Sequence, residues 1–282
     1  MGDTSVLGRS DGVAGSEQLF HQIECHATSE IGTARPVNQD QYLLAPLTPS
    51  SPETDPAYLF AVADGLGGAP AGDRASLIAT RTLFRTLREP WTDPGDTLKR
   101  AVLRCQHEID AHGERHPERA GMATTLTAAL VLWPKVHIVH VGDSRCYALR
   151  PSGAERITVD HSIAQRMAGI GVISQDQVPR SRWKNVLSNV IGGRSPDVMP
   201  ELFTTTLQWG DALLLATDGV TDPLSDEDLW ALTRERGTAE AVCDRLIRTA
   251  GERGGKDDRT VVYARFGRTP AWSKLREILL GP

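Results

Sequence analysis

The sequence contains no long apolar run and few cysteines, and each absence excludes a class of protein. No stretch of the chain reaches the roughly 20 consecutive apolar residues that span a bilayer. The N-terminus has no basic stretch leading into an apolar run, so we expect no secretory signal. The cysteines form no C-x-x-C pair, which argues against a zinc ribbon or a disulfide framework. They are Cys25, Cys105, Cys146 and Cys243. We therefore expect a cytoplasmic protein with reduced thiols and no membrane partner.

The middle of the chain also lacks a proline-rich or serine-rich linker and any internal repeat. Its 282 residues therefore favour one large domain, which we place at residues 21–267. Residues 1–20, rich in Gly, Ser and Asp, are expected to form a flexible lead-in, and residues 268–282 a C-terminal tail. The net charge of −5 gives no reason to expect nucleic acid as a partner.

Apolar runs predict strands that alternate with regions of helical periodicity. The expected strands are Tyr42–Ala45, Tyr58–Ala63, Thr125–Trp133, Val136–Val141, Arg145–Arg150, Ala212–Ala216 and Thr260–Phe266. The expected helices are 72–88, 96–111, 225–235 and 238–251, the last three with Asp96, Ser225 and Thr238 as N-caps. Gly142–Ser144, between two of the strands, predicts a short hairpin connection. This order indicates an α+β fold with helices packed outside paired sheets.

Acidic residues stand where several of these strands begin or end. Asp64 and Asp218 follow apolar strands, and Asp257 precedes the last one. Asp40 lies just before a strand, and Asp143 lies between two. A single Asp-Gly pair is typical of a turn. Several carboxylates gathered at the ends of neighbouring strands, however, would repel one another unless cations neutralised them.

The chemistry of such a cluster favours particular ions and a particular reaction. Many oxygen ligands without a His/Cys cluster select Mg²⁺ or Mn²⁺. Two such ions about 3.5–4 Å apart can hold a shared water and orient it for in-line attack on phosphorus. Arg35, just upstream of Asp40, carries a guanidinium that matches a phosphoryl group with two hydrogen bonds, although a lone arginine is more typical of a solvated surface.

The motifs together resemble the metal-dependent protein phosphatase family (PPM, the type 2C serine/threonine phosphatases), especially its single-domain bacterial members. In chain order they are Gly32-x-x-Arg35-x-x-Asn38-x-Asp40, Asp64-Gly65-Leu66-Gly67-Gly68 with Gly72, Thr124-Thr125, Gly142-Asp143-Ser144-Arg145-x-Tyr147, Asp160-His161-Ser162, Asn185-Val186-Leu187 with Ile191-Gly192, Asp218-Gly219 and Asp257-Asp258-Arg259-Thr260. Each motif is weak alone, whereas the ordered series, over about residues 30–266, is highly specific. The resemblance implies a four-layer α-β-β-α sandwich of two antiparallel sheets packed face to face.

The resemblance also implies a role for each candidate residue. It implies that Asp64 bridges two Mn²⁺ or Mg²⁺ ions and that the carbonyl of Gly65 is a further ligand. The remaining ligands would be Asp218 and Asp257 at one ion, Asp40 at the other, and Asp143 with Asp218 at a weaker third ion. Arg35 matches the residue that binds the substrate phosphate. Arg35, Asp64 and Asp218 are thus the expected catalytic residues.

The sequence departs from the family pattern at four positions. Leu66 stands where some members have a His that can act as general acid, so another group must protonate the leaving oxygen. Gln39 replaces a frequent Glu, Asp258 a frequent Asn, and Ala123 a usual Gly. None of these changes removes an expected metal ligand.

Some of these residues also allow other interpretations. Gly65-x-Gly67 resembles a dinucleotide-binding turn, but Pro70 stands where the third glycine belongs, and no Walker-type lysine motif occurs. The irregular segment 163–186, with Trp183, is either a solvated loop or a flap that meets a phosphopeptide. We expect hydrolysis of phosphoserine or phosphothreonine in proteins, with a serine/threonine protein kinase as one candidate substrate. The alternative is a non-catalytic pseudophosphatase that binds a phosphoprotein.

Overall fold

The computed structural model describes residues 22–47, 57–66, 71–193 and 197–267. These residues form two five-stranded antiparallel sheets and a small two-stranded one. The expected lead-in 1–20 and tail 268–282 lie outside the described residues. None of the helices in the described ranges is long and apolar enough to cross a membrane.

The first sheet has the strand order β1-β12-β11-β7-β8. Its strands are β1 (Gln22–Glu30), β7 (Arg145–Arg150), β8 (Gly153–Arg156), β11 (Ala212–Ala216) and β12 (Arg259–Gly267). The second sheet has the order β10-β6-β5-β3-β2. Its strands are β2 (Asp40–Leu47), β3 (Ala57–Asp64), β5 (Leu126–Leu132), β6 (Lys135–Val141) and β10 (Glu201–Thr206). The short strands β4 (Ala123–Thr124) and β9 (Ile191–Gly192) pair with each other.

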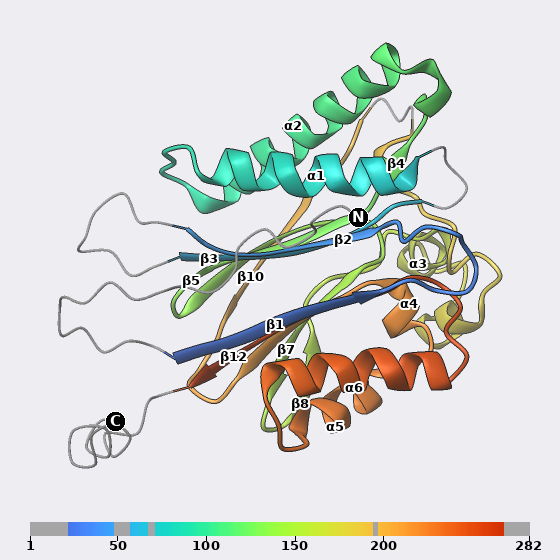
Figure 1. The fold of residues 1–282 in the computed structure, drawn as a ribbon. Helices are drawn as coiled ribbons and strands as arrows, with labels where there is room; N and C mark the ends of the chain where they lie inside the picture. The colour runs from blue at the N-terminus through green and yellow to red at the C-terminus, as the bar shows by residue number, and fades with distance from the viewer. Residues whose placement is uncertain (1–21, 48–56, 67–70, 194–196, 268–282) are drawn as a thin grey trace.

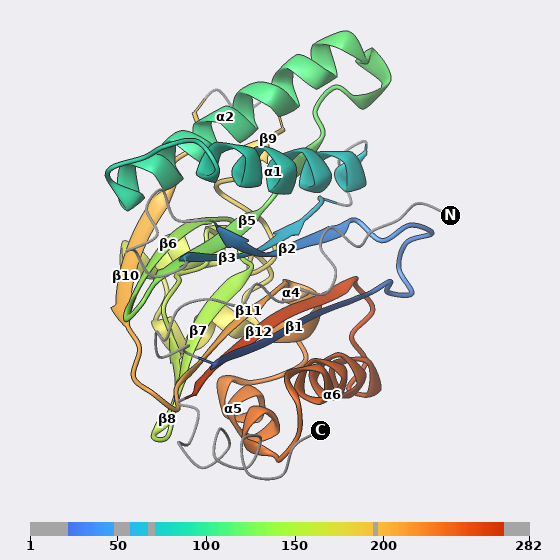
Figure 2. The same ribbon diagram turned by 60° about the vertical axis from the view of Figure 1, so that its left-hand side comes forward.

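Helices cover the outer face of each sheet, as Figures 1 and 2 show. On the second sheet lie α1 (Gly72–Leu87) and α2 (Pro94–Arg115), followed by the 3-10 turn η1 (Pro117–Arg119). On the first sheet lie α4 (Asp218–Thr221), α5 (Asp226–Arg234) and α6 (Ala239–Glu252). The segment between β8 and β9 contains α3 (Ile163–Gly169) and η2 (Gln175–Arg180). The expected four-layer α-β-β-α sandwich is confirmed.

Strand β3 shows why several strands are apolar on both faces. Leu59 and Ala61 pack with α1 and α2, whereas Phe60 and Val62 pack with residues of the opposite sheet. Since successive side chains of a strand point to opposite faces, a strand between a helical layer and a second sheet needs an unbroken apolar run. Such an apolar run ends at Asp64, the last residue of β3.

Two helix caps follow the sequence pattern and one does not. The side chains of Ser225 and Thr238 accept hydrogen bonds at the N-termini of α5 and α6, as predicted. The prediction of Asp96 as the cap of α2 is wrong. Asp93 is the N-cap and accepts from the backbone N–H of Asp96 at 2.7 Å, and Pro94 takes the first helical position. Proline fits there because that residue's N–H has no partner within the helix.

The hairpin predicted at Gly142–Ser144 is also wrong. Strands β6 and β7 belong to different sheets, so the turn between them passes from one layer of the sandwich to the other. Gly142 has φ of 111°, and a Cβ there would lie 2.5 Å from side-chain atoms of Thr125. Only glycine fits this position, because both the backbone conformation and the space exclude a side chain. Asp143 lies in this turn, where the chain passes from one sheet to the other.

Strands β1 and β10 were not predicted. Both lie at sheet edges, and β10 has no buried residue. An edge strand with one solvated face carries few apolar residues and gives a weak sequence signal.

Candidate active site

The first pair of candidate residues comes from neighbouring strands. Asp40 begins β2 and Asp64 ends β3, and the two residues are direct partners in the antiparallel register. Their side chains are 2% and 6% exposed, respectively. Directly opposed residues of a sheet share a face, so both carboxyl groups reach the same region.

The backbone of Asp64 is fixed by Thr124, the last residue of β4, and by Thr125, which follows it. Its N–H donates to the hydroxyl of Thr125 at 2.9 Å, and its carbonyl accepts from the hydroxyl of Thr124 at 2.9 Å. The same carbonyl accepts from the N–H of Thr125 at 2.8 Å. Gly65 follows, and a Cβ there would lie 2.3 Å from the backbone of Gly72 at the start of α1. The glycines at both positions therefore let α1 approach the end of β3 closely.

Asp40 is only partly paired. Its Oδ2 accepts from the hydroxyl of Thr217 at 2.8 Å, whereas its Oδ1 is buried without a hydrogen-bond partner. Burial raises the pKa of Asp40 to about 7; hydrogen bonds from Thr260 and Thr217 lower it, and the negative charges of Asp218 and Asp258 raise it. This carboxyl group therefore lies where a cation would be favoured.

Asp218 opens helix α4 at the end of β11. Its Oδ1 is also buried without a partner. Burial, followed by the charges of Asp257 and Asp222, raises the pKa of Asp218 to about 6, and a side-chain hydrogen bond with Asp64 lowers it. A Cβ on Gly219 would lie 2.0 Å from the carbonyl oxygen of Asp258, so only glycine lets this helix start pack against the chain that enters β12.

Arg35 and Asp257 form a two-pronged ion pair. The guanidinium donates from one nitrogen to Oδ2 of Asp257 at 3.0 Å, and its other terminal nitrogen lies 3.0 Å from Oδ1. The charge of Asp257 thus acts on the pKa of Asp218, while both of its carboxylate oxygens face Arg35. A guanidinium binds a carboxylate or a phosphate through two parallel N–H···O bonds. Here the bond from Nη2 is formed, whereas Nη1 lies at ion-pair distance without a hydrogen bond of its own.

Asp258 makes different contacts from the neighbouring Asp257. It is 1% exposed, and its two oxygens accept from the backbone N–H groups of Gly32 and Gln39, each at 2.8 Å. It therefore fixes the loop that carries Arg35. Both oxygens of Asp257 also have partners, because Oδ2 accepts from Arg35 and Oδ1 accepts from the backbone N–H of Asp258 at 2.8 Å. The choice of Asp257 over Asp258 as the metal ligand therefore stays a prediction.

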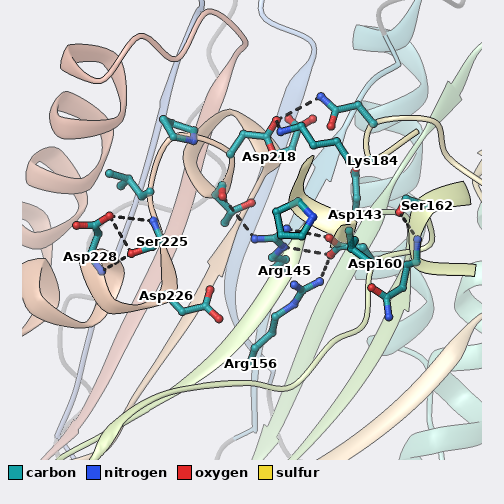
Figure 3. A pocket seen from close by; sticks show the side chains of 18 of the residues that line it. Asp143, Arg145, Arg156, Asp160, Ser162, Lys184, Asp218, Ser225, Asp226 and Asp228 are labelled. Atoms are coloured by element: carbon teal, nitrogen blue, oxygen red, sulfur yellow. Dashed lines mark hydrogen bonds and ion pairs between the residues drawn. The ribbon is translucent and has the colours of Figure 1, made fainter. Parts of the chain in front are cut away.

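Asp143 lies on the wall of a pocket of about 570 Å³ that also contains Asp218 (Figure 3). The residue is 9% exposed. Burial, followed by the charge of Asp218, raises the pKa of Asp143 well above its ordinary value. The other walls are formed by the segment 163–186 and by residues 221–228.

The segment 163–186 therefore borders the site. Lys184 forms an ion pair with Asp222 at 2.9 Å across the pocket wall, and Asn185 donates to the same oxygen at 3.2 Å. Trp183, 39% exposed, has the guanidinium of Arg182 4.7 Å from its ring centroid.

The donor set fits a divalent cation. Burial and the charges of neighbouring carboxylates raise the pKa values of a buried group of aspartates, and two oxygens have no partner. The group consists of Asp40, Asp64, Asp143 and Asp218. Carboxylate oxygens of this kind suit Mg²⁺ or Mn²⁺. In the described ranges, however, no three His, Cys, Asp or Glu side chains are already arranged so that they could hold a metal ion.

Two residues of the site were not predicted from the sequence. Asp222 donates its N–H to the carbonyl of Asp218 at 2.8 Å, and its charge raises the pKa of both Asp218 and Asp143. Its spacing of four residues from Asp218 is the signal, because residues i and i+4 share a helix face. Thr217, which donates to Asp40, gave no such signal.

Comparison with known proteins identifies the family. The family model described as Protein phosphatase 2C matches residues 34–257, which include every candidate site residue. This chain belongs to the protein phosphatase 2C family. It is 35% identical over 209 residues to the serine/threonine protein phosphatase PstP of Mycobacterium tuberculosis, covering 74% of this chain and 40% of PstP.

One further relative and one solved structure place this member of the family. The serine/threonine phosphatase stp of Listeria innocua is 31% identical, with 74% of this chain and 84% of that protein covered. The crystal structure of the catalytic domain of PstP in complex with two manganese ions superposes with a TM-score of 0.73 at 31% identity, covering 87% and 98% of the two chains. This phosphatase 2C chain thus spans less than half the length of PstP and nearly all of its catalytic domain.

Proposed function

We propose that this chain hydrolyses phosphoserine and phosphothreonine in proteins with the help of Mn²⁺ or Mg²⁺. The observation that supports the proposal best is the buried, mutually repelling group Asp40, Asp64, Asp143 and Asp218 beside Arg35. Such a group stays costly to ionise unless cations neutralise it. A protein that binds no divalent cation would have no use for it.

We assign the ion-holding roles to the residues as follows. Asp64 would bridge two ions, with the Gly65 carbonyl beside it. Asp218 and Asp257 would complete one site and Asp40 the other, with Asp143 and Asp218 at a weaker third site. Bound there, the ions would lower the pKa of a shared water and orient it for in-line attack on phosphorus.

Other residues of this chain would bind the phosphoryl group and hold the Arg35 loop in place. Arg35 would bind two phosphoryl oxygens, because a phosphate offers its guanidinium the same fork of acceptors that Asp257 now provides. Asp258 keeps the Arg35 loop in place through two backbone N–H groups. Leu66 cannot donate a proton, so the leaving oxygen must receive its proton from solvent held at the site.

The pocket bordered by Asp143 and the segment 163–186 is our candidate for the place where the phosphoprotein docks. Its lining includes residues of both charges, among them Lys184 and Asp226. A serine/threonine protein kinase would be one suitable substrate, acting with this chain in the cytoplasm.

A pseudophosphatase is the second candidate. The ion pair between Arg35 and Asp257, and the absence of a ready three-ligand cluster in the described residues, are the observations that favour it. Calorimetry separates the two functions. The phosphatase binds two Mn²⁺ ions tightly and releases phosphate from a phosphothreonine peptide, whereas a pseudophosphatase that has lost its site does neither.

A further inference from the structure

His161 lies where the turn that carries Asp143 meets the root of the segment 163–186. Its backbone N–H donates to the carbonyl of Gly142 at 2.7 Å, and its carbonyl accepts from the N–H of Ser188 at 2.8 Å. The next residue, Ser162, caps helix α3. His161 is thus tied to the Asp143 turn on one side and to the end of the segment on the other.

The ring of His161 makes a second hydrogen bond to the same residue of the turn. The backbone N–H of Gly142 donates to Nδ1 at 3.2 Å, and Asn189 Nδ2 lies 2.9 Å from that atom. Because Nδ1 accepts, the proton of a neutral ring belongs on Nε2. There it faces Oε2 of Glu201 at 3.4 Å. Both backbone groups of Gly142 are therefore bound by one residue.

The other side of the ring is packed against a fixed partner. The rings of His161 and His140 lie 4.6 Å apart, between centroids. His140 is completely buried, and burial lowers its pKa to about 3, so it stays neutral. Its Nδ1 lies 2.8 Å from the hydroxyl of Thr127, and its Nε2 lies 3.1 Å from the carbonyl of Val159. His161 therefore packs against a ring whose two nitrogen atoms both have fixed partners.

The turn has little freedom on its other face. Gly142 already has φ of 111°, and Thr125 packs directly over the position that a Cβ would occupy. The hydroxyl of Thr125 is within 2.9 Å of the hydroxyl of Ser144, at the far end of the turn. Thr125 and His161 thus both contact the turn and hold in place the backbone from which the Asp143 side chain extends.

We infer that His161 is a positioning residue, which holds the Gly142–Asp143 turn so that Asp143 can bind a divalent cation. The inference rests on the proposed function and adds to it a residue that touches neither ion nor substrate. Groups that orient a metal ligand typically change metal affinity or activity by about 10–100-fold when removed.

Two substitutions separate the hydrogen bond from the packing. His161→Phe keeps a ring against His140 but removes the acceptor for the Gly142 N–H. His161→Asn loses the ring but keeps an acceptor oxygen near the place of Nδ1. Glu201→Gln is the matched control, because it changes the partner of Nε2 and leaves Gly142 untouched.

The readouts are Mn²⁺ binding by calorimetry and the Mn²⁺ concentration that gives half-maximal phosphate release. We expect about a 10-fold or larger weakening of at least one Mn²⁺ site in His161→Phe, with His161→Asn and Glu201→Gln within about threefold of wild type. A purely structural role would lower the melting temperature of His161→Phe without this shift, and that result overturns the inference.

Each remaining outcome is decisive as well. If His161→Phe does not fold, His161→Asn decides, because Mn²⁺ binding weakened by about 10-fold or more although an acceptor is still present contradicts the inference. Wild-type protein that binds no Mn²⁺ overturns the proposed function together with this inference. Wild-type binding with an unchanged His161→Phe titration overturns the inference alone.

Discussion

Asp40 and Asp64 face each other across the β2–β3 ladder, so that two buried carboxyl groups lie on one face of the sheet where the sandwich opens. Like charges in this relationship destabilise a sheet. The fold tolerates the pair because each carboxyl group can hold its proton. A bound cation would remove the repulsion between the two ionised groups. Both the stability and the activity of the chain should therefore depend on pH and on divalent ions.

The stability of the metal-free protein should fall as pH rises from about 4 to about 7. Asp40 and Asp218 have pKa values of about 7 and about 6, raised from 3.8, so the folded state keeps protons that the unfolded state releases. The stabilisation is complete below pH 3.8 and is lost as pH rises through these folded-state values. Mn²⁺ binds the ionised form, so its effect should grow over the same range.

Melting temperatures at about pH 5 and about pH 7.5, with chelator and with Mn²⁺, check this dependence. The increase caused by Mn²⁺ should be larger at the higher pH. An increase of equal size at both values would show that these carboxyl groups do not take up the ion.

Asp218→Asn should have opposite effects on activity and on stability. It removes a proposed ligand of two ion sites, so Mn²⁺-supported phosphate release should fall by at least about 100-fold. It also removes one of the mutually repelling charges around Asp64, so the metal-free protein should melt at a higher temperature near neutral pH. Full activity of the variant would rule out the proposed mechanism.

Arg35→Lys should impair the handling of the phosphoryl group more than the binding of ions. Lysine cannot reproduce the two-pronged contact that Arg35 makes with Asp257, and losing one charged hydrogen bond costs about 1.5–3 kcal/mol. We expect kcat/KM for a phosphopeptide to fall by about 10-fold or more. Mn²⁺ affinity by calorimetry should change little or increase, because Asp257 loses a fixed partner. A large loss of Mn²⁺ affinity with unchanged kcat/KM would contradict the assignment.

Gly72→Ala should be destabilising by about 1–3 kcal/mol, since overpacking forces the backbone to shift. The new Cβ would lie 2.7 Å from the backbone of Gly65. Gly169→Ala is the matched control, because nothing lies within 4 Å of its Cβ position at the end of α3. Denaturant unfolding of both variants checks the contrast. Equal stability would mean that the close approach of α1 to the end of β3 is not required.

The sequence predicted most of what is local. Continuous apolar runs, helix caps at Ser225 and Thr238, and the acidic residues at strand ends are all properties of short windows, and the structure has them. The turn at Gly142 shows the limit of such windows. Its length suits a hairpin equally well as a crossover, and only the pairing of β7 with β11, more than 60 residues further along the chain, decides between them.

The two neighbours Asp257 and Asp258 show the same limit within the site. Both are acidic and adjacent, yet one faces Arg35 and the other binds the loop beneath it. These contacts join residues more than 200 positions apart. The pairing of Asp40 with Asp64 likewise follows from the register of the sheet rather than from any motif.

The most direct test of the account is the rate of phosphate release from a phosphothreonine peptide as Mn²⁺ is added to chelator-treated protein. The account predicts no release before Mn²⁺ is added, a saturable rise as it binds, and loss of the rise in Asp218→Asn. Release that persists in excess chelator, or no release at any Mn²⁺ concentration, would contradict it.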